Sequence, residues 1–217
     1  MAKMKIDELN ILGASDDEAF DYNEFIDHYF DTMQISKKQK KQRIEAAKEI
    51  MDIILYFLIW CDEFPEQIND EVLRQFENDY KQKIFEFSEP DDYFATYVPI
   101  FINNLVTTTL EHKGDTYFTS VERAANVAVN ESNLTFGHME LQRAKSAGYK
   151  YKTWRTELDE RVRPTHALVE GKTIPIDEPF LVGDSLMMFP KDQYTYNANP
   201  EEIVNCRCVC SYSKKEV

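Results

Sequence analysis

The side chains most able to do chemistry gather toward the end of the 217-residue chain. Three of its four cysteines, Cys206, Cys208 and Cys210, stand on alternate positions of the run NCRCVC. Thiols in such a pattern can bind a metal, form disulfides, act in redox chemistry or fill one buried face of a strand. Which of these roles they have largely decides whether the protein does chemistry.

A second polar group precedes the cysteines, in TWRTELDERVRPTHALVEGKTIP. A histidine flanked by arginines and carboxylates could act as a general base. No nucleophile elbow, P-loop or HExxH motif accompanies it, so no second catalytic element is visible. We therefore expect the group to fix the local fold by hydrogen bonds and not to catalyse. Its members are Asp159, Arg161, Arg163, His166 and Glu170.

A metal site is the main alternative, and its first ligands would be His166, Cys206 and Cys208. Structural zinc usually takes four Cys or His ligands, often presented by turns. If the cysteines lie on one strand, the extended backbone separates Cys206 from Cys208 by about 6.6 Å. That spacing suits neither one zinc ion nor a disulfide. The sequence therefore predicts reduced, packed thiols, with no metal and no cofactor.

The elements that position these residues differ between the two halves of the chain. Residues 36–146 have the periodicity of helices. Ser36 and Gln39 form a capping-box pattern, and the apolar run that follows stops before Pro65. Pro99 should kink or split a later helix. The three further helices are expected over about residues 69–89, 91–112 and 116–146.

Beyond Gly148 the pattern changes, and five of the eight prolines fall between Pro164 and Pro200. The segments YKYKTW, KTIPI, SLMMF and IVNCRCVC have the composition of strands joined by turns. The sequence thus predicts an α+β fold, with a helical N-terminal region followed by a small β-rich α+β C-terminal domain. The expected divisions are an acidic arm over 1–34 that can be disordered, a helical region over 35–115, and a C-terminal domain over 116–217.

Composition and charge exclude several classes. The formal net charge is −14, so the chain repels phosphate over most of its surface and is not a general nucleic-acid binder. The most apolar stretch, Ile50 to Trp60, has eleven residues and is too short to cross a bilayer. The first residues show no secretory signal, so we expect thiols that stay reduced in a cytoplasm.

An ordered set of motifs covers about residues 118–210. The Trp154 strand is followed by D-x-R-V-R-x-x-H, then PIDEPFLV, M-x-F-P-x-D and finally NCRC. This order resembles the phage Mu F-like domain of minor head proteins from tailed bacteriophages. The motif residues are Trp154, Asp159, Arg161, Arg163, His166, Gly171, Pro190, Asn205, Cys206 and Cys208.

The resemblance implies a structural, non-enzymatic minor head protein of a tailed phage or prophage. Such a protein is made in the cytoplasm of the bacterial host, resides in the virion and acts in head morphogenesis and genome delivery. Its implied partners are the portal and/or the major capsid protein, with at most weak contact with packaged DNA and none with a membrane. Some family members carry Cys-x-x-Cys where this chain has Arg163 to His166, and this departure argues further against a metal.

Two other classes remain open from the sequence. An enzymatic effector, such as a nuclease or transferase carried on a head-targeting domain, would need a catalytic constellation within residues 1–115. That region offers only His28 and His112 among scattered carboxylates. The other class is a DNA-binding module, for which the net charge of −14 is a poor match.

Overall fold

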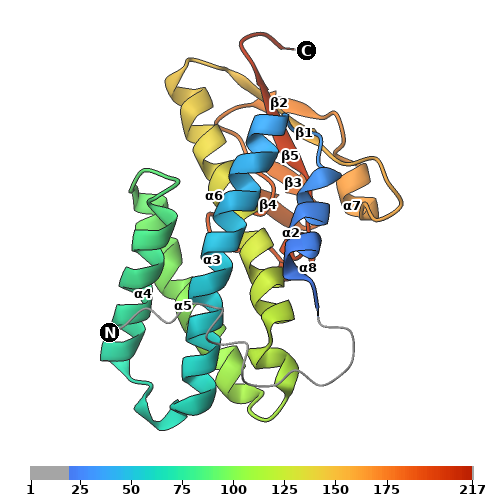
Figure 1. Ribbon diagram of the computed structural model, residues 1–217. Helices are drawn as coiled ribbons and strands as arrows, with labels where there is room; N and C mark the ends of the chain where they lie inside the picture. The colour runs from blue at the N-terminus through green and yellow to red at the C-terminus, as the bar shows by residue number, and fades with distance from the viewer. Residues whose placement is uncertain (1–19, 217) are drawn as a thin grey trace.

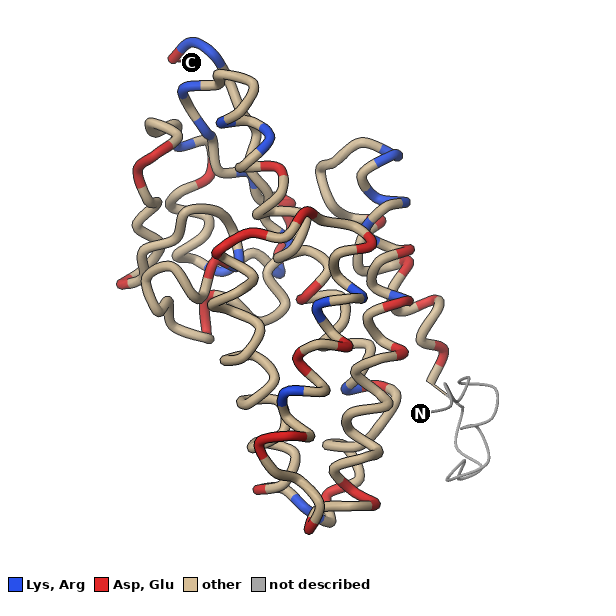
Figure 2. The backbone as a smooth tube through the Cα atoms, turned by 90° about the vertical axis from the view of Figure 1, so that its left-hand side faces the viewer, with Lys and Arg blue, Asp and Glu red and all other residues tan. Residues whose placement is uncertain are grey.

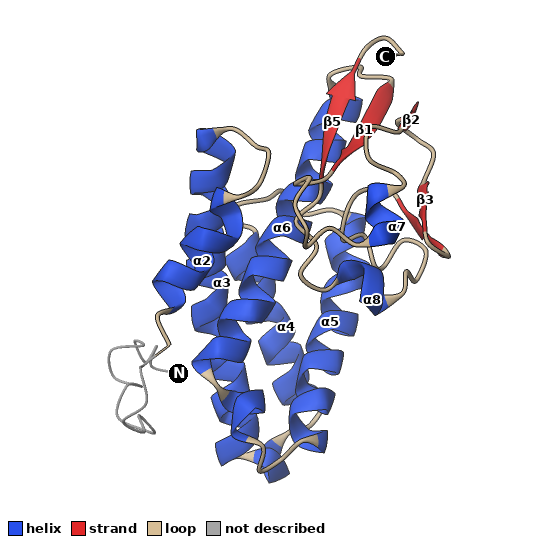
Figure 3. Ribbon diagram, turned by 90° about the vertical axis from the view of Figure 1, so that its right-hand side faces the viewer, coloured by secondary structure: helices blue, strands red, loops and turns tan. Residues whose placement is uncertain are grey.

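The computed structural model describes residues 20–216. Long helices form one end of the molecule, and the strands gather at the other end beside the C-terminus (Figure 1, Figure 3). The helices are α2 (Tyr22–Asp31), α3 (Lys37–Glu63), α4 (Asp70–Ile84), α5 (Asp92–Glu111), α6 (Val121–Ser146), α7 (Pro164–Ala167) and α8 (Pro200–Ile203). Two short 3₁₀ turns, Pro65–Gln67 and Thr116–Thr119, join long helices. The α+β fold predicted from the sequence is confirmed.

Local signals explain where the long helices begin and end. The capping box of Ser36 and Gln39 opens α3, as predicted. Asp91 caps α5, which passes through Pro99 as one helix, so the predicted split does not occur. The predicted fourth helix is shorter than expected, because the 3₁₀ turn precedes Ser120, which caps α6.

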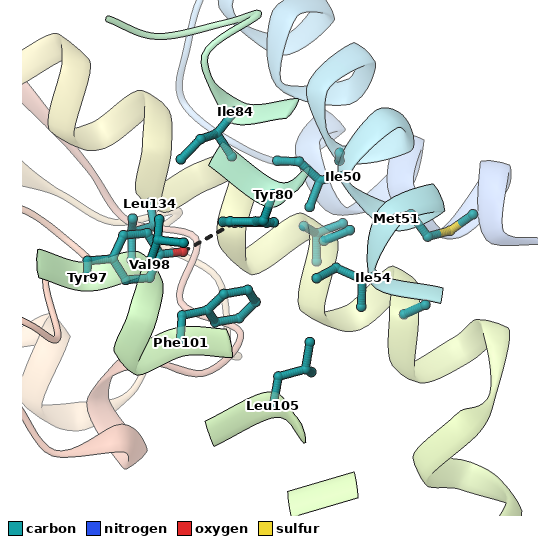
Figure 4. Close-up of a cluster of buried hydrophobic side chains, with 14 of the residues drawn as sticks. Ile50, Met51, Ile54, Tyr80, Ile84, Tyr97, Val98, Phe101, Leu105 and Leu134 are labelled. Carbon is teal, nitrogen blue, oxygen red and sulfur yellow. Dashed lines mark hydrogen bonds between the residues drawn. The ribbon is translucent and has the colours of Figure 1, made fainter. Parts of the chain in front are cut away.

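The main hydrophobic core lies where α3, α4, α5 and α6 meet. Figure 4 shows Tyr80 of α4 between the apolar side chains of α3 and α5, with its hydroxyl 3.2 Å from that of Tyr97. The Tyr80 hydroxyl also donates to the buried carboxylate of Glu131 at 2.8 Å. This core continues to Val209 at the sheet end. Among the described residues, no helix is both long and apolar enough to span a membrane.

The strands form two small antiparallel units. The three-stranded sheet has the order β2–β1–β5, from β1 (Tyr151–Arg155), β2 (Thr173–Pro175) and β5 (Val209–Ser213). A hairpin pairs β3 (Phe180–Val182), which was not foreseen as a strand, with β4 (Ser185–Met187). In the sheet, Trp154 pairs with Cys210.

The cysteine segment corrects one sequence prediction. Only Cys210 lies in β5, whereas Cys206 and Cys208 precede it in irregular chain. The residues before them form the short helix α8, capped by Asn199, in place of a strand. Asn205 then adopts a left-handed conformation, with φ of 56°, which turns the chain. The premise that an extended strand separates the thiols therefore does not hold.

The N-terminal segment also differs from the expectation of an arm over 1–34. Residues 1–19 lie outside the described part, but α2 packs against α3 and α6. Asp21 caps it, and its apolar face buries Ile26, Tyr29 and Phe30. The spacing of these three residues on one helical face places α2 in the core.

Candidate functional site: a buried histidine–cysteine cluster

His166, Cys206 and Cys208 converge on one point. Their ligand atoms all lie within 4.8 Å of one another, and all three side chains are buried. The Nδ1 atom of His166 is 3.3 Å from Cys208 Sγ and 3.6 Å from Cys206 Sγ. The structure thus brings together the three residues that the sequence singled out as the first ligands of a metal.

Each side chain is positioned by a different local feature. His166 lies in α7, which begins at Pro164. Proline suits the first position of a helix because the N–H there has no partner within the helix. Cys206 follows the left-handed Asn205, and its N–H closes a turn onto Ile203 at 3.2 Å. The ring of Trp154 meets His166 edge-on, with ring centroids 5.5 Å apart.

The second ring nitrogen of His166 has its own partner. Its Nε2 is 2.9 Å from Oε2 of Glu202, which also accepts from the Thr165 hydroxyl at 2.8 Å. Glu202 was not identified from the sequence, because it lies on α8 and only the fold brings it to His166. Gly183 leaves room for it, since a Cβ there would be 2.7 Å from Glu202 Oε1.

Burial and hydrogen bonding distribute the protons of the cluster unevenly. The hydrogen bond between the thiols lowers the pKa of Cys206, with help from His166 and against burial. The same hydrogen bond, together with burial, raises the pKa of Cys208. Burial opposes charge on His166, but Cys206 and Glu202 outweigh it and raise the pKa of the imidazole. These contacts therefore favour the thiolate form at Cys206 over that at Cys208.

The chain around the cluster connects the two ends of the molecule. The Cys206 carbonyl accepts from the Tyr29 hydroxyl of α2 at 2.9 Å and from Asn133 of α6 at 3.4 Å. The Asn205 N–H donates to Asn130 Oδ1 at 2.9 Å. We call Asn205 to Cys208 the NCRC segment; it ties the helical body to the sheet region.

The predicted polar group divides into separate contacts. Asp159 binds Arg161 at 3.4 Å and Arg207 of the NCRC segment at 2.7 Å. Arg163 donates to the Val204 carbonyl, so it also binds the end of α8. The hydrogen bonds of Asp159, Arg161 and Arg163 thus go to one another, to Arg207 or to the backbone, and not to the His166 ring. Arg207 was missed because its sequence position gives no sign that it reaches Asp159.

Glu170 and the motif residues Gly171 and Pro190 lie in the surrounding turns. Glu170 accepts from the Thr156 N–H. Gly171 has φ of 71° and donates its N–H to the Trp154 carbonyl at 2.9 Å, a backbone conformation that favours glycine. Pro190 is buried, and its carbonyl would lie 3.7 Å from a Cβ on Gly137 of α6.

Two surface clefts lie away from the cluster. One, of about 500 Å³, lies between the start of α3, the end of α6 and β5. The other, of about 400 Å³, lies between the end of α4 and α6. Cys210 lines the first cleft, but among the described residues that line the two clefts none is His166, Cys206 or Cys208.

Comparison with known proteins identifies the family. A family model described as Phage Mu protein F like protein matches residues 102–211, just over half of the chain. Searches of curated proteins and of solved structures gave no significant match. The matched region runs from α5 to β5 and includes every motif residue and the whole cluster. The chain therefore belongs to the Phage Mu protein F-like family of phage head morphogenesis proteins.

Proposed function

We propose that the chain is a minor head protein of a tailed phage or prophage. It is present in few copies, contacts the portal or the inner face of the capsid, and acts in head assembly and genome delivery. The observation that carries this proposal is the family match over residues 102–211, which spans the complete set of ordered motifs.

The charge of the molecule agrees with a place beside packaged DNA. Asp and Glu number 39 against 25 Lys and Arg, and acidic residues recur along the helical body (Figure 2). A protein of this charge is repelled by the phosphate backbone. It can therefore act beside the genome without being held by it, and its specific contacts fall to protein partners.

The burial of the cluster favours a structural protein over an enzyme. The exposed fractions of His166, Cys206 and Cys208 are 2%, 2% and 5%. A nucleophilic cysteine has to reach its substrate through a partly exposed site. The NCRC segment instead holds α2, α6, α7 and β5 together, which suits a rigid module that docks onto a larger assembly.

A deletion and complementation experiment tests the proposal. Removing the gene from the phage or prophage should abolish or strongly reduce infectious particles, and the wild-type gene in trans should restore them. Trp154→Ala empties a site that is 0% exposed, whereas Leu168→Ala truncates a side chain that is 85% exposed. We expect Leu168→Ala to restore infectivity and Trp154→Ala to fail. Normal heads and normal titre from the deletion strain would contradict the proposal.

A further inference from the structure

We propose that His166, Cys206 and Cys208 bind one zinc ion, with Glu202 orienting the histidine. The sequence predicted no metal because it placed both thiols on one strand, and because the chain lacks the Cys-x-x-Cys that some family members carry at Arg163 to His166. In the structure they lie in irregular chain between the turn that follows α8 and the start of β5, so the first of these reasons no longer applies.

The spacing of the three ligand atoms matches zinc coordination. Zn–N bonds of about 2.0–2.1 Å and Zn–S bonds of about 2.3 Å at tetrahedral angles place nitrogen and sulfur ligands about 3.6 Å apart. The two distances from His166 Nδ1 to the sulfurs are 3.3 and 3.6 Å. Two sulfurs on one zinc lie about 3.8 Å apart, and the pair here lies within 4.8 Å. Small side-chain adjustments complete the geometry.

The surroundings of His166 also have the form of a metal site. A ligating histidine usually donates its other N–H to a carboxylate, which fixes the tautomer and the ring plane. Here Nδ1 faces the sulfurs, while Nε2 faces Glu202 at 2.9 Å. The Thr165 hydroxyl holds the same carboxylate oxygen at 2.8 Å. The ring is therefore oriented before a metal arrives.

Charge and burial favour a divalent, thiophilic cation. Two thiolates balance the charge of one Zn²⁺, so the loaded site adds no net charge to a buried position. The Trp154 indole N–H, whose ring packs against His166, is buried without a hydrogen-bond partner in the described part of the chain. Among the described residues the cluster supplies three ligands, which leaves the fourth tetrahedral position to a water molecule.

Cobalt substitution tests the site in the full-length, reduced protein. After treatment with a chelator, the protein is titrated with Co²⁺, a spectroscopic substitute for zinc. We expect a thiolate-to-cobalt charge-transfer band that saturates at about one Co²⁺ per chain, and Zn²⁺ should abolish it. Metal analysis of the zinc-treated protein should likewise give one equivalent. A wild-type protein that folds normally but gives no such band would overturn the proposal, whatever the variants do.

Matched variants assign the ligands. Cys206→Ala and Cys208→Ala should each lose the band, while Cys210→Ala, which removes a thiol two residues farther along, should keep it. Glu202→Gln should keep the band and weaken Zn²⁺ affinity by about 10–100-fold. Circular dichroism checks that each variant is folded. A band that survives in folded Cys206→Ala or Cys208→Ala, or that disappears in folded Cys210→Ala, would overturn the ligand set.

Discussion

Asp159 accepts hydrogen bonds from two arginines that differ mainly in burial. Arg207 is 9% exposed and reaches both Asp159 and Thr32, at 2.7 and 2.9 Å. The Arg161 side chain is 54% exposed and lies 3.4 Å from the same carboxylate. Desolvation raises the pKa of Asp159, but the contacts with Arg207 and Arg161 together outweigh it and lower the pKa below its usual value. The two arginines thus allow a buried contact and a solvent-exposed contact with the same carboxylate to be compared.

Replacing these arginines should have unequal effects. Arg207→Met keeps most of the apolar stem but removes both hydrogen bonds, and it should lower the free energy of unfolding by about 1–3 kcal/mol. Arg161→Met should change it by less than about 1 kcal/mol, because exposed ion pairs contribute little. Urea denaturation of both variants measures the difference. An equal loss of unfolding free energy in the two variants would show that the burial of Arg207 does not strengthen its hydrogen bonds.

Glu131 gives the molecule a pH dependence. Burial raises the pKa of its carboxyl to about 7, although the hydrogen bond from Tyr80 acts in the opposite direction. Between the ordinary carboxyl pKa and about 7, the folded state holds this proton and the unfolded chain releases it. The stability that the protonated Glu131 carboxyl contributes is therefore complete below its ordinary pKa of 4.5. It declines above that pH and is lost as the pH rises through about 7.

Glu131→Gln should remove this dependence. Relative to the variant, the wild-type protein should lose roughly 3 kcal/mol of unfolding free energy as the pH rises from about 4.5 to above 7. Denaturant unfolding of both proteins at several pH values gives the difference directly. Parallel pH profiles would mean that Glu131 titrates alike in the folded and unfolded states.

At the scale of elements, patterns within one segment could be predicted, but contacts between segments could not. The capping box at Ser36 and the stripe of Phe76, Tyr80 and Ile84 were readable because both depend on neighbours three or four residues apart. The strand predicted over Ile203 to Cys210 begins only at Val209, since the left-handed residue Asn205 changes the direction of the chain before it. His166, Cys206 and Cys208 were identified, but their convergence and the partner Glu202 come from the tertiary fold.

The docking of α2 depends on one buried hydrogen bond as well as on packing. Tyr29→Phe removes the contact with the Cys206 carbonyl and keeps the ring, so it should destabilise the protein by about 1 kcal/mol. Phe30→Ala empties a site that is 0% exposed and should cost about 3–5 kcal/mol. Thermal unfolding monitored by circular dichroism should give melting temperatures in the order wild type, Tyr29→Phe, Phe30→Ala. A wild-type melting temperature for Phe30→Ala would contradict the placement of α2 in the core.

Two glycines in different turns form a matched pair: Gly183 lies between β3 and β4, and Gly171 lies between α7 and β2. Gly183 and Gly171 both have positive φ, 57° and 71°, but only at Gly183 would a Cβ meet another group, Glu202. Gly183→Ala should therefore destabilise the protein more than Gly171→Ala, which bears only the backbone cost of about 1 kcal/mol. Chemical denaturation compares the two, and a smaller effect at Gly183 would show that Glu202 is not held in place.

At the scale of the whole molecule, the helical body and the sheet region are joined through one continuous core and through the NCRC segment. The family match begins inside α5 and ends in β5. The earlier helices α2 and α3 nevertheless pack directly on α6 of the matched region. We therefore expect the two regions to act as one unit in contacts with other head proteins.

The presence of the protein in assembled heads is the most direct test of this account. Particles and procapsids purified from the phage or induced prophage that encodes the chain can be digested and quantified by mass spectrometry, with the major capsid protein as the internal standard. The account predicts peptides from this chain in a small, fixed ratio to the capsid protein, far below one copy per capsid subunit. Absence of the chain from both particles and procapsids, while it is made in the infected cell, would contradict it.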